Sequence, residues 1–90
     1  MVLRKTKKIK SQKKTFEAIR RNLLNQLAKG QKNINELARD SKINWKTAYN
    51  HMIYLRGKRY VKFVINLPQV KIFELTQSGL EASINKKNKI

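Results

Sequence analysis

A first segment of the chain has apolar residues at intervals of three and four positions, the spacing of one face of an α-helix. Its apolar residues are Phe16, Ile19, Leu23, Leu24 and Leu27, with Ala28 beside them. Thr15 precedes the segment with a hydroxyl suited to capping a first turn, and Gly30 follows it with the conformational freedom that ends many helices. The pattern therefore predicts a first helix that begins after Thr15 and ends at Gly30.

Two further helical segments follow, separated by a tight turn. The shorter one begins near Asn35 and has the pattern of a capped two-turn helix, with Leu37 and Ala38 facing inward. We expect Ser41 and Lys42 to form the turn that ends it.

The third predicted helix begins at Asn44, whose side chain accepts hydrogen bonds from N–H groups that the first turn leaves free. Gly57 marks its end. Its inward stripe is predicted to carry Ala48, Met52 and Leu55. Its opposite side is predicted to carry Trp45, Lys46, Tyr49, Asn50 and Ile53.

After Gly57 the period changes to two, which predicts strands over 60–66 and 70–75 joined by a three-residue loop. This loop sets Asn66 opposite Val70, and it pairs aromatic with aromatic and cation with anion. A two-residue loop would lose both favourable pairs, Phe63 with Phe73 and Lys62 with Glu74. The predicted pairs nearer the base are Phe63 with Phe73, Lys62 with Glu74, and Val61 with Leu75, so that Val61, Phe63, Phe73 and Leu75 share the core face. Thr76 caps a short last helix that extends through Ile84.

This order of elements resembles the winged helix-turn-helix domains of MarR- and ArsR-like regulators and of small archaeal and viral proteins akin to them. The resemblance covers residues 15–85 and rests on INELARDSKIN at 34–44, WKTAYNHMIYLRGKRYV at 45–61 and KIFELTQSGLE at 71–81. It implies an α+β, mostly helical fold with three helices, a two-stranded wing hairpin and a short C-terminal helix. The family's turn usually has a glycine where Lys42 stands, which leaves open a longer or differently shaped turn.

The charge of the chain is concentrated at its ends. The 90 residues contain 22 Lys and Arg against five Asp and Glu, a net charge of +17, and the length suits one domain. Residues 15–85 carry 12 of these cations and all five acids, which leaves a domain of +7 between two basic tails. The tail at 86–90 has three lysines, and the flexible tail at 1–14 has Arg4, Lys5, Lys7, Lys8, Lys10, Lys13 and Lys14.

The composition argues against an enzyme, a metal site and a cofactor. The chain has no cysteine, one histidine and five scattered acids, so no nucleophile–base or metal-ligand constellation can be assembled. We expect His51 to be a structural residue that hydrogen-bonds a backbone group. Because no apolar run approaches the length of a membrane span, we expect an intracellular protein, cytoplasmic or nucleoid-associated, with no membrane contact and no evident small-molecule ligand.

The resemblance places the start of the third helix in the major groove of double-stranded DNA. The candidates for base readout are Trp45, Lys46, Thr47, Tyr49 and Asn50. The amide of Asn50 can donate and accept together in the pattern that adenine presents. Lys46 suits a guanine or a phosphate, and the hydroxyls of Thr47 and Tyr49 suit the backbone. Two interpretations of Trp45 stay open, because its indole could contact DNA or fold back onto the domain.

The wing and its neighbourhood supply candidates for backbone contact. These residues are Arg56, Lys58, Arg59, Lys62, Gln69 and Lys71, and the cations of the amino-terminal tail join them. An alternative for Lys62 is an ion pair with Glu74.

The sequence thus predicts a DNA-binding protein that acts as a transcriptional regulator, with its third helix (44–57) in the major groove and with wing and tail on the phosphates. Two alternatives stay open: a winged helix that binds ribosomal or other structured RNA, and a nonspecific architectural module that coats DNA or binds proteins. A homodimer is a further hypothesis, because members of the family that the chain resembles commonly dimerise. The apolar faces of the first and last helices could form the contact, or the outer face of the hairpin, which carries Val64, Val70 and Ile72.

Overall fold

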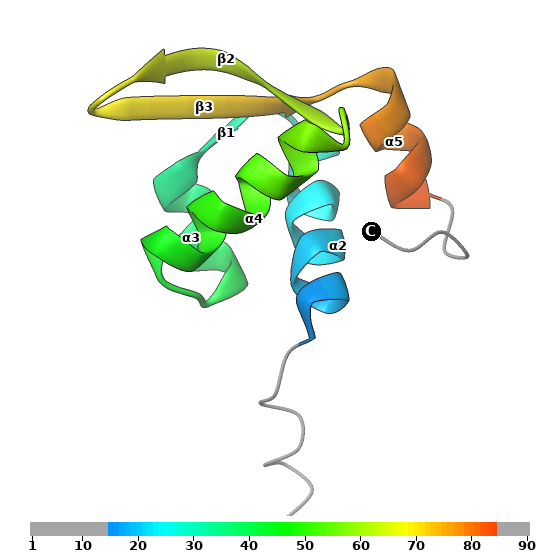
Figure 1. Cartoon of the computed structure of the whole chain (residues 1–90), viewed down its shortest axis with the longest axis horizontal. Helices are drawn as coiled ribbons and strands as arrows, with labels where there is room; N and C mark the ends of the chain where they lie inside the picture. The colour runs from blue at the N-terminus through cyan, green and yellow to red at the C-terminus, as the bar shows by residue number, and fades with distance from the viewer. Residues whose placement is uncertain (1–14, 85–90) are drawn as a thin grey trace, which may run out of the picture.

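The computed structural model describes residues 15–84, which form four helices and three strands (Figure 1). Within this range no helix has the length and apolar character needed to cross a membrane. Both basic tails, 1–14 and 86–90, lie outside the described residues. The elements are α2 (Phe16–Leu27), β1 (Lys32–Asn33), α3 (Ile34–Ser41), α4 (Trp45–Gly57), β2 (Val61–Leu67), β3 (Val70–Leu75) and α5 (Gln77–Ile84).

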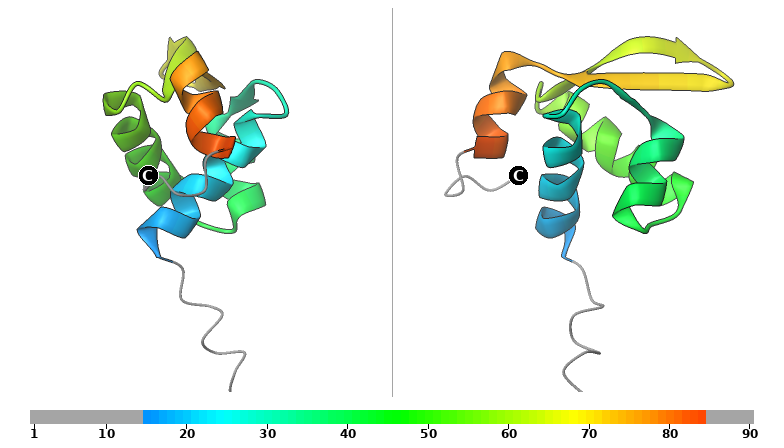
Figure 2. Two further views of the ribbon diagram at one scale, coloured as in Figure 1. Left: turned by 90° about the vertical axis from the view of Figure 1, so that its right-hand side faces the viewer. Right: turned by 180° about the vertical axis from the view of Figure 1, so that it is seen from behind.

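The three strands form one antiparallel sheet in the order β1-β3-β2, and the helices lie on one side of it (Figures 1 and 2). Helix α2 is central, since it contacts α3, α4 and α5. The two-residue strand β1 is the element that the sequence analysis did not predict; it pairs Lys32 with Phe73 and Asn33 with Ile72.

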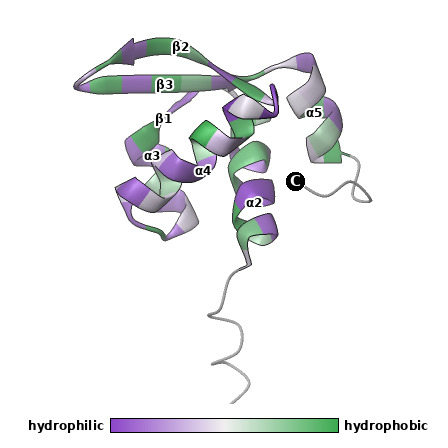
Figure 3. Ribbon diagram, viewed as in Figure 1, coloured by the Kyte–Doolittle hydropathy of each residue, from purple (hydrophilic) through white to green (hydrophobic). Residues whose placement is uncertain are grey.

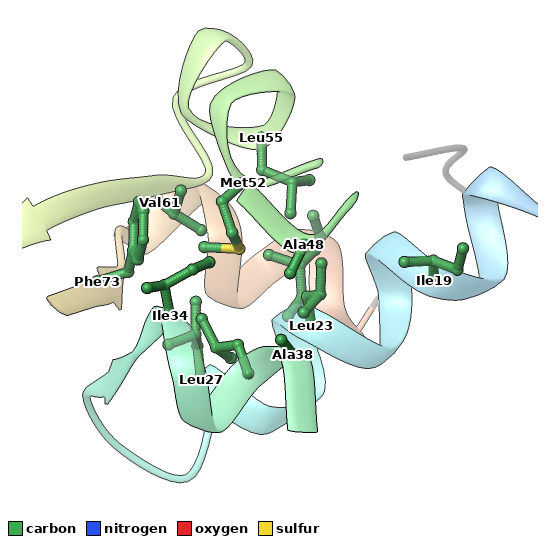
Figure 4. Close-up of a cluster of buried hydrophobic side chains, with 13 residues drawn as sticks. Ile19, Leu23, Leu27, Ile34, Ala38, Ala48, Met52, Leu55, Val61 and Phe73 are labelled. Carbon is green, nitrogen blue, oxygen red and sulfur yellow. The ribbon is translucent and has the colours of Figure 1, made fainter. Parts of the chain in front are cut away.

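One hydrophobic core joins the helices to the base of the hairpin (Figure 4). Leu23 and Leu24 of α2 are fully buried beside Leu37 of α3. The predicted stripe of α4 and the predicted core face of the hairpin both contribute, with Phe63 and Leu75 only partly buried. Figure 3 shows hydrophobic and hydrophilic residues interleaved along the hairpin and the helices, as expected for elements with one covered face.

Two residues of the predicted apolar face of α2 are not in the core. Phe16 is 66% exposed, because it lies in the first turn, beyond the end of the core, and Ala28 is also exposed. The cap of this helix is confirmed, since the Thr15 hydroxyl accepts a hydrogen bond from the Ala18 N–H. The helix ends at Leu27, three residues before Gly30, which adopts a positive φ of 141°.

The helix-turn-helix unit is capped at both of its helices. Helix α3 begins at Ile34, one residue before the predicted start, and Asn33 caps it in a capping box, in which its side chain accepts from the Glu36 N–H and the Glu36 carboxylate accepts from the Asn33 N–H. Asn44 caps α4 as predicted, accepting from the Thr47 N–H at 2.8 Å. The turn is not lengthened, because Lys42 itself adopts the left-handed conformation (φ 59°, ψ 43°) that glycine usually provides.

The hairpin has the predicted pairs at its base but not the predicted loop. Val61 pairs with Leu75, Lys62 with Glu74 and Phe63 with Phe73. Towards the tip, however, Asn66 faces Lys71 and Leu67 faces Val70, so the loop is two residues long. The pairing changes register between the base and the tip because β2 has a bulge at Val64. This one extra residue in β2 shifts the pairing by one position.

Candidate nucleic-acid interface

The outward face of α4 is formed by Lys46, Asn50 and Ile53, which are all exposed. It lies opposite the buried stripe of Ala48, His51, Met52 and Leu55. Lys46 and Asn50 are one turn apart in the amino-terminal half of the helix, and Lys46 lies in the first turn, where the helix dipole favours an anion. This face therefore presents a cation and an amide to solvent without a neighbouring acid on the helix.

Trp45 and Tyr49 lie together on the side of α4 that faces the wing. Their rings are stacked, with centroids 5.2 Å apart and planes 5° apart. Tyr49 is partly buried against the core, whereas Trp45 stays 43% exposed. Trp45 was expected either to contact DNA or to fold back onto the domain. Its indole stacks on Tyr49 and still has much of its surface exposed, so neither interpretation describes it fully.

Thr47 lies on the opposite flank of α4, beside α2. It is partly buried and, with Asn50, lines an open hollow of about 300 Å³ whose other walls are Phe16, Arg20 and His51. The five residues predicted for base readout are therefore spread over three sides of the helix. Lys46 faces outward, and Asn50 is exposed at the rim of this hollow.

The tip of the wing is joined to α4 through Lys71. Its ammonium group donates to Asn66 Oδ1 at 3.0 Å and to the Leu67 carbonyl oxygen at 3.2 Å, and it lies 5.8 Å from the Tyr49 ring centroid. Gln69 is exposed in the two-residue loop beyond it. The wing thus holds one cation close to the amino-terminal half of α4.

Lys62 forms the ion pair with Glu74 that was the alternative to a DNA contact. Its ammonium group lies 3.2 Å from a Glu74 carboxylate oxygen. Hydrogen bonds from Gln31 and from Lys62 lower the pKa of the Glu74 carboxyl group, since both stabilise its ionised form. Lys62 is therefore less available for a phosphate than the other cations of the wing.

Three exposed cations follow one another near the carboxyl end of α4. Arg56 lies over the Phe63 ring at 5.3 Å, and Lys58 lies 5.9 Å from the Tyr54 ring centroid. Arg59 adopts a left-handed backbone conformation with φ 68°. The three cations thus lie where the chain passes from α4 into β2, at the base of the wing.

His51 is buried, but its hydrogen-bond partner is a side chain and not the predicted backbone group. The Arg20 Nε donates to His51 Nδ1 at 3.0 Å. Burial and the positive charge of Arg20 both lower the pKa of His51, so its imidazole is neutral at pH 7. The Phe16 ring meets His51 edge to face at 5.1 Å.

The aromatic contacts of Arg20 were not predicted from the sequence. Its guanidinium carbon lies 3.6 Å from the Tyr54 ring centroid and 5.2 Å from that of Phe16. The spacing of Phe16 and Arg20 by one turn was a usable signal for the second contact. The first contact joins α2 to α4, and no pattern within either segment points to it.

Comparison with known proteins supports the fold. No protein-family model and no curated protein matches the sequence. Among solved structures, the chain is similar to ZitR of Lactococcus lactis, a zinc-responsive MarR family member, with a TM-score of 0.66 and 18% identity over 73% of this chain and 47% of that one. It is also similar to the adhesin competence repressor AdcR of Streptococcus pyogenes, with a TM-score of 0.68 and 19% identity over 84% of this chain and 57% of that one.

These similarities confirm the predicted fold class: the domain has the winged helix-turn-helix fold that these two structures share. The chain spans about half the length of the two solved structures. Among the residues that the structure describes, no group of three or more His, Cys, Asp or Glu is placed to hold a metal ion.

Proposed function

We propose that the protein is a DNA-binding transcriptional regulator that inserts α4 into the major groove of double-stranded DNA. The observation that carries this proposal is the outward face of α4, where Lys46 and Asn50 stand exposed in a winged helix-turn-helix fold. An α-helix fits the major groove, and residues near its amino end are the ones that reach base edges.

Within this proposal Asn50 reads a base. Its amide N–H can donate to adenine N7 while its carbonyl oxygen accepts from the exocyclic N6 amine, the bidentate pattern that suits adenine. Lys46, one turn earlier, takes a phosphate or a guanine. Trp45, Thr47 and Tyr49 flank this pair and make supporting contacts with sugar, phosphate or a thymine methyl group.

The cations around the wing hold the DNA backbone. Arg56, Lys58 and Arg59 neutralise phosphates beside the inserted helix, and Gln69 and Lys71 contact the backbone at the wing tip. Lys62 contributes least, because it is paired with Glu74. The basic tails add sequence-independent attraction. A protein that acts on DNA in this way resides inside the cell.

Selection of binding sites from random duplexes tests this proposal. We expect the full chain to enrich one sequence and Asn50→Ala to lose the preference at one base-pair position, with a loss of about 1–3 kcal/mol in discrimination. Lys46→Ala should weaken binding. The matched controls are Asn25→Ala and Lys29→Ala, which change exposed residues of the same types on and just after α2.

The controls should select the same sequence as the unchanged chain. If neither Asn50→Ala nor Lys46→Ala alters selection or affinity, α4 does not read DNA. Tighter binding to structured RNA than to duplex DNA at equal salt would favour the RNA-binding alternative, and equal affinity for random and selected duplexes would favour an architectural role. Protection of two half-sites about one helical turn apart would indicate a homodimer.

A further inference from the structure

A hollow of about 200 Å³ opens between α3, the start of α4 and the tip of the wing. It is smaller than the pockets of about 300–1,000 Å³ that hold drug-sized ligands, so it suits one planar ring rather than a larger molecule. The role proposed above places Trp45, Gln69 and Lys71 beside duplex DNA but puts no group into the hollow itself. Its walls are Asn33, Ile34, Asn35, Trp45, Pro68, Gln69, Val70 and Lys71.

Trp45 gives this hollow an aromatic wall held in a fixed place. Tyr49 is parallel to the indole to within 5° and is itself packed against the core, so the indole is supported from one side. Trp45 nevertheless keeps 43% of its surface exposed. A supported and exposed indole is the kind of surface on which nucleobases stack, whatever their sequence.

The polar groups of the hollow suit the edge of a base and its phosphate. The side-chain amides of Asn35 and Gln69 make no hydrogen bond within residues 15–84, so their donors and acceptors are free to meet a ligand. Lys71 is the charged residue of the lining, and its ammonium group is held in place by Asn66 and Leu67. The lining includes no acid, which favours an anionic ligand.

We propose that this hollow binds one unpaired nucleobase, stacked on Trp45, with Lys71 on an adjacent phosphate. In an intact duplex each base is covered above and below by its neighbours, so it has no face to offer to the indole. A bulged base or a single strand has such a face. This inference rests on the proposed function and adds to it that the protein prefers nucleic acid with an unpaired base beside the duplex that α4 contacts.

The fluorescence of Trp45 tests the proposal directly, because Trp45 is the sole tryptophan of the chain. The probes are a duplex of fixed sequence and the same duplex with one unpaired thymidine, each prepared as DNA and as RNA. We expect the unpaired thymidine to quench the emission and to tighten binding at least about fivefold, the lower end of the effect of stacking one base. The DNA and RNA arms show which backbone is accepted.

Variants measured by the anisotropy of a labelled strand separate stacking from general affinity. The readout is the dissociation constant for the intact duplex divided by that for the bulged duplex. A ratio is needed because Trp45→Leu also removes a candidate for duplex contact, which would weaken the binding of both probes. We expect Trp45→Leu to bring this ratio to about one, and Trp45→Phe to restore part of it because a flat ring returns. The matched control is Tyr54→Leu, another exposed aromatic of α4 that lies outside the hollow, and it should keep the ratio.

A ratio near one in the unchanged chain, or a ratio that survives Trp45→Leu, would overturn the inference and leave the duplex-binding function standing. Binding to neither probe would overturn both. Circular dichroism of Trp45→Leu checks the fold, which we expect to persist since the indole lies outside the buried core.

Discussion

Among single residues, Arg20 and His51 form the most unusual contact of the domain. A guanidinium group donates to the ring nitrogen of a buried imidazole and is covered by the Tyr54 ring. The bond needs an unprotonated Nδ1, because a protonated nitrogen cannot accept. Protonation of His51 would also set two cations side by side.

We therefore predict that the stability of the domain falls as the pH falls below about 6.5, the ordinary pKa of histidine. The pKa of His51 is lowered in the folded chain. As the pH falls, the unfolded chain therefore binds a proton at His51 at a higher pH than the folded chain does, and this proton binding stabilises the unfolded state relative to the folded state. The midpoint of thermal unfolding, followed by circular dichroism, should be lower at pH 5.5 than at pH 7.5. Above pH 5 the Glu74 carboxyl group adds little, because its lowered pKa keeps it ionised in this range.

The matched variant is His51→Gln, which retains an acceptor for Arg20 and does not titrate. Its unfolding midpoint should depend less on pH over the same range. If the unchanged chain and His51→Gln respond to pH alike, the Arg20–His51 contact is not the source of the dependence.

Contacts within one turn were predictable at this scale and contacts across the fold were not. The caps Thr15, Asn44 and Thr76 follow from sequence alone, because a capping side chain meets an N–H only three residues away. The partner of His51 is 31 positions distant, and which flank of α4 meets α2 is decided by the packing of the whole core. For the same reason Trp45 and Tyr49 could be assigned to the outer side of α4 but not to the wing.

Among elements, α5 is fastened to the chain segment between α4 and the wing. The Thr76 hydroxyl donates to the Arg59 carbonyl oxygen at 2.6 Å, and the Thr76 N–H donates to the Tyr60 carbonyl oxygen at 3.0 Å. The Thr76 hydroxyl also accepts from the Gly79 N–H, which draws the first turn of α5 against Tyr60. The position of α5 and the base of the wing are thereby coupled.

We predict that Gly79→Ala loosens this junction. A Cβ atom at Gly79 would overlap with the backbone carbonyl of Tyr60, and backbone cannot move aside as a flexible side chain can. Overpacking of this kind costs about 1–3 kcal/mol in the free energy of unfolding, measurable by urea denaturation.

Gly57→Ala is the control for this substitution. Gly57 is helical and an added Cβ would meet no atom within 4 Å apart from its chain neighbours and the backbone of its own helix, so alanine should raise the stability by up to about 1 kcal/mol. Equal effects of the two substitutions would mean that the contact between Gly79 and Tyr60 is not tight.

The hairpin shows how a prediction can be right at one end of an element and wrong at the other. A three-residue loop with no bulge and a two-residue loop with one bulge in β2 give the same pairs at the base, such as Phe63 with Phe73. The side-chain pairs used to set the register lie at the base, so they could not distinguish the two arrangements. Strand β1 escaped prediction because two residues are too few to show a period.

For the whole molecule, the decisive quantity is the distribution of charge. The segments 1–14 and 86–90 carry ten of the 22 cations and no acid, while the remainder carries a net +7. Counterion release by bound cations makes the affinity for DNA depend on salt, but the phosphates are the same in every sequence. Affinity and sequence preference are thus expected to reside in different parts of the chain.

We predict that the logarithm of the affinity of the full chain for duplex DNA falls against the logarithm of salt concentration with a slope of roughly −5 to −7, as for six to eight neutralised phosphates. Removal of residues 1–14, with seven cations, should make the slope shallower and weaken binding while the selected sequence stays the same. Removal of 86–90, with three cations, should act in the same direction but less. A slope shallower than about −2 for the full chain would contradict the assignment of much of the affinity to the basic tails.

The bulge at Val64 has a consequence for how the protein behaves at high concentration. Strand β2 is an edge of the sheet and has the sequence VKFVINL, rich in residues that favour extended chains. A regular edge strand of this composition is a template on which another chain can add strands and begin an aggregate. A bulge interrupts the hydrogen-bond ladder of a strand and increases its twist, and Lys62 places a charge near the start of β2. We therefore expect the irregularity that sets the hairpin register to disfavour the addition of a further strand at this edge of the wing.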